Sequence, residues 1–238
     1  MPQTLTIIIP VYNEAATIAE ILDKIDHVQL TRGLIKEVIV VNDGSTDATH
    51  EVVTKYREAI TGFTLHYISH DTNLGKGFAV QTALRMSTGD YLIIQDADLE
   101  YDPAEYNQML EPMLSGHADV VYGSRFVGSN AHRVLYFWHY AGNRFLTFLS
   151  NLFTNLNLTD MESCYKLFRR EIIQDIALVE KRFGFEPEIT AKVARIPGVR
   201  IYEVGISYYG RTYLEGKKIN WRDGVWAIWC IIKYNIVR

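Results

Sequence analysis

Short runs of apolar, often β-branched residues recur along the first half of the chain, separated by longer stretches of mixed polarity. Uninterrupted apolar runs of this length indicate strands covered on both faces, as in parallel sheets with helices packed on each side. We therefore predict an α/β fold with a mostly parallel sheet. The predicted strands are 5–11, 37–41, 64–68, 91–94 and 118–122.

The segment after the first predicted strand has the periodicity of an amphipathic helix. Ile18, Ile21, Leu22 and Ile25 recur at i, i+3, i+4 and i+7, and polar residues occupy the opposite face. A parallel pair of strands needs such a crossover connection. The early chain therefore predicts repeated βαβ units.

Polar side chains follow four of the predicted strands. In open α/β sheets, ligands bind outside the carboxyl ends of the strands. We therefore predict that these segments share one edge of the sheet and line one site. They are Tyr12-Asn13-Glu14, Asn42-Asp43-Gly44-Ser45, Asp96-Ala97-Asp98 and Gly123-Ser124-Arg125.

Asp96 and Asp98 lie two residues apart, directly after the fourth predicted strand. Side chains at i and i+2 of an extended chain point the same way, so both carboxylates can bind one hard divalent cation. Such a cation keeps positions open for substrate phosphates. Taken alone, the pair could also be solvated loop acids or a helix cap before Pro103.

Length, composition and charge indicate a globular protein and argue against some classes of partner. The 238 residues and 48% hydrophobic content suffice for a large domain with a core. A net charge of -4 argues against a nucleic-acid partner. Cys164 and Cys230 lack metal-ligand spacing, so we expect free thiols in a reducing compartment. The N-terminus lacks the features of a secretory signal, which makes the cytoplasm the expected location.

Two aromatic-rich segments, 134–158 and 221–236, stand out in the second half of the chain. Polar residues such as Asn143 and Arg144 make the first too polar to span a bilayer, and the apolar run in the second is too short. Each segment predicts either a buried helix or a helix lying on a lipid surface.

Two common nucleotide-binding motifs are absent. No G-x-G-x-x-G follows the first strand, and Gly75-Lys76-Gly77 lacks the upstream Gly and the following Ser or Thr of a phosphate-binding loop. Four other motifs are present: Ile9-Pro10-Val11-Tyr12-Asn13-Glu14, Val41-Asn42-Asp43-Gly44-Ser45-Thr46-Asp47, Asn73-Leu74-Gly75-Lys76-Gly77 and Asp96-Ala97-Asp98. In their order and spacing, these motifs resemble those of family 2 glycosyltransferases.

The second half of the chain contains further motifs: Gly123-Ser124-Arg125, Phe185-Glu186-Pro187-Glu188, Tyr209-Gly210-Arg211 and Glu215-Gly216-Lys217-Lys218. These motifs resemble, more narrowly, the dolichyl- or polyprenyl-phosphate sugar synthase branch. The resemblance covers most of the chain and implies a GT-A fold, with a Rossmann-like, mostly parallel sheet flanked by helices. It also implies a catalytic domain at 1–212 and a C-terminal extension at 213–238, with an acceptor loop and an amphipathic segment.

The resemblance implies that the donor is a nucleotide diphosphate sugar, such as a GDP- or UDP-hexose. Asp43 would accept hydrogen bonds from the nucleobase, and Tyr12 and Glu14 would flank base and ribose, with Pro10 in the same motif. Lys76 would contact the nucleotide. The alternatives are helix capping for Asp43, a first-turn acid for Glu14 and an exposed loop lysine for Lys76.

The same resemblance implies that Asp96 and Asp98 bind Mg²⁺ or Mn²⁺. The metal charge would stabilise the nucleoside diphosphate as the sugar bond breaks. Glu100 either completes the coordination or is solvated.

The chemical group that accepts the hexose determines which catalytic residues the reaction needs. A phosphate monoester is largely dianionic at pH 7 and needs cations in place of a base. We favour Arg125 at a strand end and Arg211 in the Gly-Arg turn, whereas Arg133 and Lys218 could equally be surface residues. The prediction is an inverting transfer of a hexose to a polyprenyl or dolichyl phosphate, with Asp98, Arg125 and Arg211 as catalytic residues. The available cations are Arg125, Arg133, Arg211, Lys217 and Lys218.

Two other functions stay open. If the acceptor is a hydroxyl of a polysaccharide or lipid-linked saccharide, Asp160, Glu186 or Glu188 would act as the base, unless these acids only pair with Lys166, Arg169 or Lys192. The third alternative is a non-catalytic nucleotide-sugar-binding subunit, although an intact set of strand-end acids argues against it.

A polyprenyl phosphate presents its phosphate at a lipid surface. We therefore expect a protein that is peripheral at the cytoplasmic face of the membrane. It would bind that surface through the aromatic segments, either by itself or with a membrane partner protein.

Overall fold

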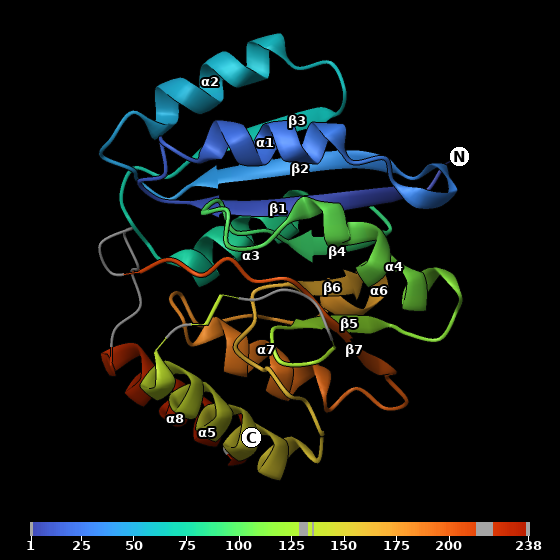
Figure 1. Cartoon of the computed structure of the whole chain (residues 1–238), viewed down its shortest axis with the longest axis vertical. Coiled ribbons are helices and arrows are strands. Elements are labelled where there is room, and N and C mark those ends of the chain that lie inside the picture. Colours follow the sequence, from blue (N-terminus) through green and yellow to red (C-terminus); the bar gives the residue numbers. More distant parts are fainter. Residues whose placement is uncertain (1, 129–132, 135, 213–220, 237–238) are drawn as a thin grey trace.

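The computed structural model describes residues 2–128, 133–134, 136–212 and 221–236. Its strands form one sheet in the order β3-β2-β1-β4-β6-β5-β7 (Figure 1). All five strands predicted from the sequence are present. The bounds are β1 (Thr4–Val11), β2 (Ile35–Asn42), β3 (Thr64–Ser69), β4 (Tyr91–Ile94), β5 (Val120–Ser124), β6 (Lys166–Arg169) and β7 (Ile201–Gly205).

The sheet is parallel except for β6. Ile8 of β1 pairs with Ile39 of β2 and with Ile94 of β4, both in parallel register. β6 runs antiparallel between β4 and β5, and β7 pairs in parallel with β5. The predicted α/β fold is therefore confirmed, with an additional antiparallel strand inside the sheet.

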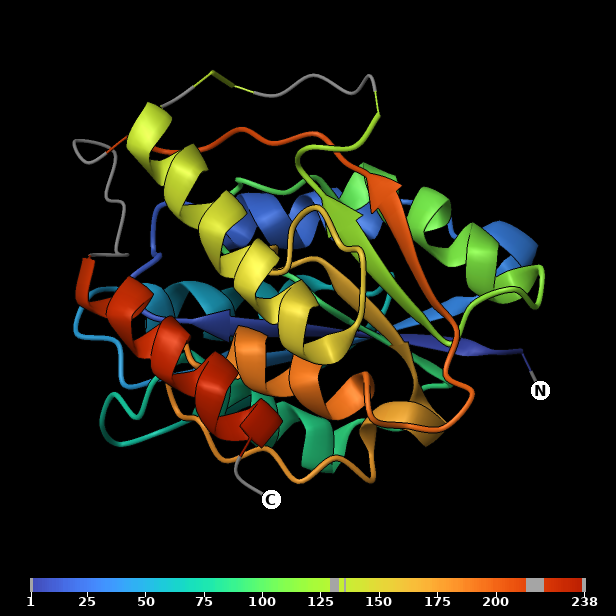
Figure 2. The ribbon, with the colours of Figure 1, turned by 90° about the horizontal axis from the view of Figure 1, so that it is seen from below.

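Helices cover both faces of the sheet. Figure 2 shows the blue and green helices α1 and α4 on one side and the orange and red helices α7 and α8 on the other. The apolar stripe predicted for α1 is fully buried at Ile18, Ile21, Leu22 and Ile25. The helix bounds are α1 (Ile18–His27), α2 (Thr49–Ala59), α3 (Lys76–Met86), α4 (Tyr106–Leu114), α5 (Phe137–Thr154), α6 (Arg170–Ile173), α7 (Phe185–Val193) and α8 (Trp221–Ile236), with short 3₁₀ turns η1 (Thr31–Gly33) and η2 (Pro103–Glu105).

Helices α5 and α8 lie side by side, and α8 also packs on α7 (Figures 1 and 2). Only Thr147 and Ser150 of α5 are buried, so this helix is not the buried helix that the sequence left open. The pair exposes large apolar side chains, which we call the α5–α8 face. They are Phe137, Trp138, Tyr140, Phe145, Phe148, Leu152, Val225, Trp226 and Trp229.

Among the described residues, no helix combines the length and the apolar character needed to cross a membrane. The predicted division at residue 212 stays a prediction. The described part of the proposed extension, α8, packs against α5 and α7 of the proposed catalytic domain.

Candidate active site

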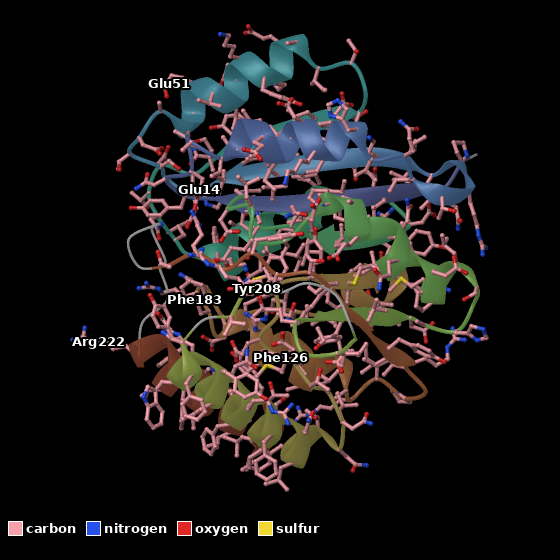
Figure 3. The ribbon with its side chains drawn as sticks, in the orientation of Figure 1. Glu14, Glu51, Phe126, Phe183, Tyr208 and Arg222 are labelled. Carbon is pink, nitrogen blue, oxygen red and sulfur yellow. The ribbon has the colours of Figure 1, made fainter. Side chains whose placement is uncertain are left out.

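The polar strand ends meet at one edge of the sheet, as predicted. After β1, Asn13 N donates to Ser45 Oγ after β2, at 2.9 Å. Arg211, which follows β7, bridges Glu14 after β1 and Asp98 after β4. In Figure 3, Glu14, Tyr208 and Phe126 follow one another along this edge.

Asp43 holds the loop that leads into α3. Its carboxylate accepts hydrogen bonds from Leu74 N (3.0 Å), Gly75 N (2.7 Å) and His70 Nδ1 (2.9 Å). Asp43 therefore does not cap α2, whose first turn is instead bound by Asp47 through Thr49 N at 3.0 Å. The contact between Asp43 and a nucleobase stays a prediction. In this structure the Asp43 carboxylate binds the loop before α3.

Lys76 is the first residue of α3 and is largely buried, so the alternative of an exposed loop lysine is wrong. Its Nζ lies 2.8 Å from Asp96 Oδ1, 2.7 Å from Cys164 Sγ and 3.7 Å from Glu186 Oε1. Burial by itself would raise the pKa of Asp96, but the Lys76 ammonium holds it below its usual value. Asp96 is thus an ionised carboxylate with a fixed counter-ion.

Asp98 lies in a turn beyond β4, which ends at Ile94. Ala97 and Asp98 form a turn, and Leu99 follows it with a φ of 65°, so the extended geometry expected for Asp96 and Asp98 is wrong. Asp96 contacts Lys76, whereas Asp98 Oδ2 lies 3.1 Å from Arg211 Nη2. Consecutive acids of this segment therefore contact different cations.

Burial raises the pKa of Asp98 to about 7, with added repulsion from the Asp96 and Glu100 carboxylates and a smaller opposing effect of Arg211. Glu100 is not simply solvated, because it accepts from Arg211 N at 2.7 Å and from Tyr208 Oη at 2.9 Å. These crowded carboxylates form a site at which added positive charge is favourable.

The residues present fit a divalent cation that is shared with a substrate. Among the described residues, no three acidic, His or Cys side chains are grouped closely enough to hold a metal by themselves. Mg²⁺ in phosphate-binding sites usually takes one or two carboxylates and completes its shell with phosphate oxygens and water. Asp98 and the neighbouring acids supply that number of ligands.

Arg211 forms a two-pronged ion pair with Glu14. Nη2 lies 2.8 Å from Glu14 Oε1 and Nη1 lies 3.2 Å from Oε2. Thr17 Oγ1 also donates to Glu14 Oε2, at 2.9 Å. Glu14 is therefore a buried carboxylate that forms an ion pair within the site, and its role is not limited to the start of α1.

Arg125 is held by Asp160. The guanidinium donates from Nε to Oδ2 at 2.6 Å and from Nη2 to Oδ1 at 2.7 Å, and Asn143 Nδ2 donates to Oδ1 at 3.1 Å. Burial opposes ionisation of Asp160, yet Arg125 holds the pKa of that carboxyl below its usual value. Asp160 thus pairs with Arg125 and is poorly placed to accept a proton.

The segment Tyr208–Arg211 brings the predicted acceptor arginines together. Arg133 N donates to Tyr208 O at 2.9 Å, and Arg133 Nη1 donates to Gly210 O at 3.0 Å. The Arg125 guanidinium lies over the Tyr208 ring, 5.1 Å from its centre. Lys217 and Lys218, also predicted to bind the acceptor, lie outside the described residues.

Two predicted bases have structural partners. Glu188 is fully buried and accepts from Val179 N (2.8 Å), Glu180 N (2.7 Å) and Lys192 Nζ (2.5 Å). Glu186 forms an ion pair with the fully buried Lys166 through Oε2. The pairings with Lys192 and Lys166 that the sequence left open are therefore present.

The sequence analysis missed a group of polar atoms beside this ion pair. Glu162 Oε1, Ser163 Oγ and Glu186 Oε1 are buried without a hydrogen-bond partner among the described residues. Burial and the nearby Glu186 carboxylate raise the pKa of Glu162 to about 7, against the effect of Lys166. Buried polar atoms without partners mark a place where a polar ligand or water binds. No residue motif identified this group, because it depends on the course of the chain into β6.

Residues 6–177 match the family model for glycosyl transferase family 2, and the chain belongs to this family. Curated relatives include the dodecaprenyl-phosphate galacturonate synthase of Rhizobium johnstonii, which is 25% identical over 88% of this chain and 60% of that protein. The undecaprenyl-phosphate 4-deoxy-4-formamido-L-arabinose transferase of Pseudomonas aeruginosa is 27% identical over 89% of this chain and 59% of that protein. Glycosyltransferase AglJ of Haloferax volcanii is 28% identical over 88% of this chain and 64% of that protein.

The chain therefore spans about 60% of the length of these relatives. Among solved structures, it is similar to the glucosyl-3-phosphoglycerate synthase of Mycobacterium tuberculosis in complex with Mn²⁺, UDP and glucosyl-3-phosphoglycerate. The TM-score is 0.76 at 20% identity, covering 99% of this chain and 81% of the other. This similarity confirms the GT-A fold.

Proposed function

We propose that the protein is a metal-dependent, inverting glycosyltransferase that moves a hexose from a nucleotide diphosphate sugar to a polyprenyl or dolichyl phosphate. The observation that carries the proposal is the meeting of Arg125, Arg133 and Arg211 along the segment Tyr208–Arg211, directly beside Asp98. Guanidinium groups bind phosphate oxygens in pairs, so this cluster is suited to a phosphate acceptor. The names of two relatives, a dodecaprenyl-phosphate synthase and an undecaprenyl-phosphate transferase, support the same class of acceptor.

The donor would lie along the ends of β1, β2 and β4. Asp43 and Tyr12 would bind the nucleobase side, with Pro10 in the same strand-end segment, and Glu14 the ribose. Asp96 and Asp98, with Glu100, would hold Mg²⁺ or Mn²⁺, which when bound neutralises the charge that develops on the departing nucleoside diphosphate. Lys76 would keep Asp96 ionised and in place.

The donor hexose would lie near the buried polar atoms of Glu162, Ser163 and Glu186. Sugar hydroxyls both donate and accept hydrogen bonds, so they can satisfy carboxylate and hydroxyl oxygens together. A phosphate acceptor attacks as a dianion and needs no protein base. This agrees with the engagement of both oxygens of Asp160 and Glu188 by other groups.

The acceptor lipid would approach along the α5–α8 face. Phe148 is 63% exposed and Trp229 is 50% exposed, on neighbouring helices. Aromatic side chains at an amphipathic surface bind the interface between lipid headgroups and acyl chains. We propose that the catalytic part, residues 1–212, rests on the membrane with the extension at 213–238, by direct contact or through a membrane partner protein.

The experiment is incubation with a panel of labelled UDP- and GDP-hexoses, Mn²⁺ and a polyprenyl phosphate in vesicles, with product lipids identified by mass spectrometry. Asp98→Asn should lose nearly all transfer while its unfolding curve stays close to that of the wild type. Asp175→Asn, at an exposed position after α6, is the control and should transfer normally. Normal transfer by Asp98→Asn would refute the metal role, and the absence of any glycolipid across the panel would refute the acceptor.

A second candidate function is transfer to a hydroxyl. The observation that favours it is Glu162, whose unpartnered oxygen and pKa of about 7 suit a general base at neutral pH. In that case Glu162→Gln should be inactive with every acceptor. If Glu162→Gln lost only a small part of its transfer activity, the phosphate acceptor would be favoured over the hydroxyl acceptor.

A further inference from the structure

Arg211 supplies the positive charge of the acidic site in this structure. Its Nη2 lies 3.1 Å from Asp98 Oδ2 and 2.8 Å from Glu14 Oε1, and its backbone N lies 2.7 Å from Glu100 Oε1. The guanidinium is thus a stand-in for a cation among the carboxylates that the proposed function gives to a metal. Its own Nε is buried without a hydrogen-bond partner among the described residues, so the guanidinium is not fully satisfied there.

A guanidinium and a divalent cation compete for such a position. Both are attracted by the same carboxylates, and two cations within a few ångströms repel each other. The counter-ion of Asp96, by contrast, is Lys76 on the rigid start of α3. Arg211 belongs to an irregular segment after β7, so it can change position without disturbing the sheet.

We propose that Arg211 is the exchangeable counter-ion of Asp98. Without a divalent cation, Arg211 neutralises Asp98 and Glu14, and it leaves Asp98 when a divalent cation and nucleoside diphosphate bind. The released guanidinium then binds the phosphate of the acceptor beside Arg133 and Arg125. This inference rests on the proposed function, since it takes Asp98 as a metal ligand.

The exchange makes metal binding and acceptor binding interdependent. Arg211 cannot pair fully with Asp98 and with an acceptor phosphate at once. A ligand that takes Arg211 away from Asp98 therefore favours the metal, and the metal favours that ligand to the same degree. Donor binding would thus prepare the acceptor site before the lipid phosphate arrives.

The first test measures Mn²⁺ affinity from the electron paramagnetic resonance signal of free Mn²⁺, with UDP and with GDP. Because it lacks the competing cation, Arg211→Ala should bind Mn²⁺ roughly tenfold more tightly than the wild type, within the usual range of coupling between sites. Arg211→Lys, which keeps the charge without the planar fork, should fall between them. Arg200→Ala removes a comparable arginine, paired with Asp119 at 2.6 Å, and should bind Mn²⁺ like the wild type.

Methylguanidinium separates competition from a general effect of charge. Added at concentrations that leave the circular dichroism spectrum unchanged, it should return Arg211→Ala to weak Mn²⁺ binding and leave the wild type unchanged. Failure of methylguanidinium to weaken binding in the variant would overturn exchange at a shared position.

The second test uses farnesyl phosphate as a short acceptor analogue, measured by calorimetry. Mn²⁺ with UDP or GDP should strengthen its binding to the wild type roughly fivefold or more, and should not strengthen its binding to Arg211→Ala. Equal Mn²⁺ affinity in wild type and Arg211→Ala would overturn this inference alone. No Mn²⁺ binding to either protein, with either nucleotide, would overturn the proposed metal role and this inference with it.

Discussion

Lys76 Nζ lies 2.8 Å from Asp96 Oδ1, which gives the first acid of the Asp96-Ala97-Asp98 segment a permanent partner inside the protein. The same ammonium donates to Cys164 Sγ at 2.7 Å. Burial alone would lower the pKa of Lys76, but the surrounding Asp96, Cys164 and Glu186 raise it well above its usual value. The site therefore contains an ion pair that is present before any ligand binds.

Removing Lys76 should cost stability as well as function. Lys76→Met leaves a buried carboxylate without its cation, so the free energy of unfolding should fall by about 3 kcal/mol. Urea unfolding monitored by circular dichroism measures this loss. Lys24→Met is the control, because Lys24 forms only an exposed pair with Glu20 at 3.9 Å, and should change stability by less than about 0.5 kcal/mol. Similar losses in both variants would show that the pair with Asp96 contributes little.

Glu162 should make stability depend on pH. Its folded pKa of about 7 lies above the usual value of 4.5, so the folded state binds more protons than the unfolded state between these values. Stability from this group is therefore present at low pH and lost as the pH rises towards and past 7. Glu162→Gln removes this pH dependence. Between pH 4.5 and 8 the wild type should therefore lose about 3 kcal/mol more of its free energy of unfolding than the variant does.

The measurement is urea unfolding of both proteins across that pH range. Glu51→Gln is the matched control, because Glu51 is exposed on α2 (Figure 3), and its slope against pH should follow the wild type. Parallel curves for Glu162→Gln and the wild type would contradict a raised pKa at Glu162.

Asp43 should protect specific amides from hydrogen exchange. Its carboxylate accepts from Leu74 N and Gly75 N, so Asp43→Ala leaves both donors without that partner and should destabilise the loop by about 1–3 kcal/mol. Native-state exchange should show faster exchange at these two amides. The Ile8 amide in the centre of the sheet is the internal reference. Unchanged exchange at Leu74 and Gly75 would contradict the anchoring role.

The α5–α8 face should determine binding to lipid. Phe148→Glu places a charge on a side chain that is 63% exposed, and should weaken binding to anionic vesicles roughly tenfold, the effect of losing one buried aromatic group. Sedimentation with vesicles measures this. Ile35→Glu, at a 51% exposed residue that begins β2, is the control and should bind vesicles like the wild type. Equal losses in the two variants would argue against a specific face.

Much of the fold could be predicted because local sequence patterns indicate its first five strands and α1. Four of these strands carry an unbroken apolar run, β3 is interrupted only at His66, and the stripe of α1 repeats at helical spacing. β6 is different, since it has only two apolar residues between Lys166 and Arg169. Only the tertiary structure shows that Lys166 is buried, by pairing it with Glu186.

The meeting of the polar strand ends was predictable from the sequence, as for Glu14 and Asp98, which Arg211 bridges. The site was not predictable where a residue's role depends on a distant partner. Nothing near Arg125 in the sequence indicates that Asp160 will hold it. The turn at Ala97 and Asp98 likewise gives Asp96 and Asp98 separate partners, although their spacing suggests a common one.

The reversed direction of β6 has a consequence for how the candidate site can vary. Because β6 runs opposite to β4 and β5, it starts at the rim where its neighbours finish. The stretch from Asp160 to Cys164, which leads into β6, therefore lies at the edge of the sheet that carries the candidate site. Substitutions or length changes in this stretch would alter the side chains beside the candidate site while the hydrogen bonds of the sheet stay the same.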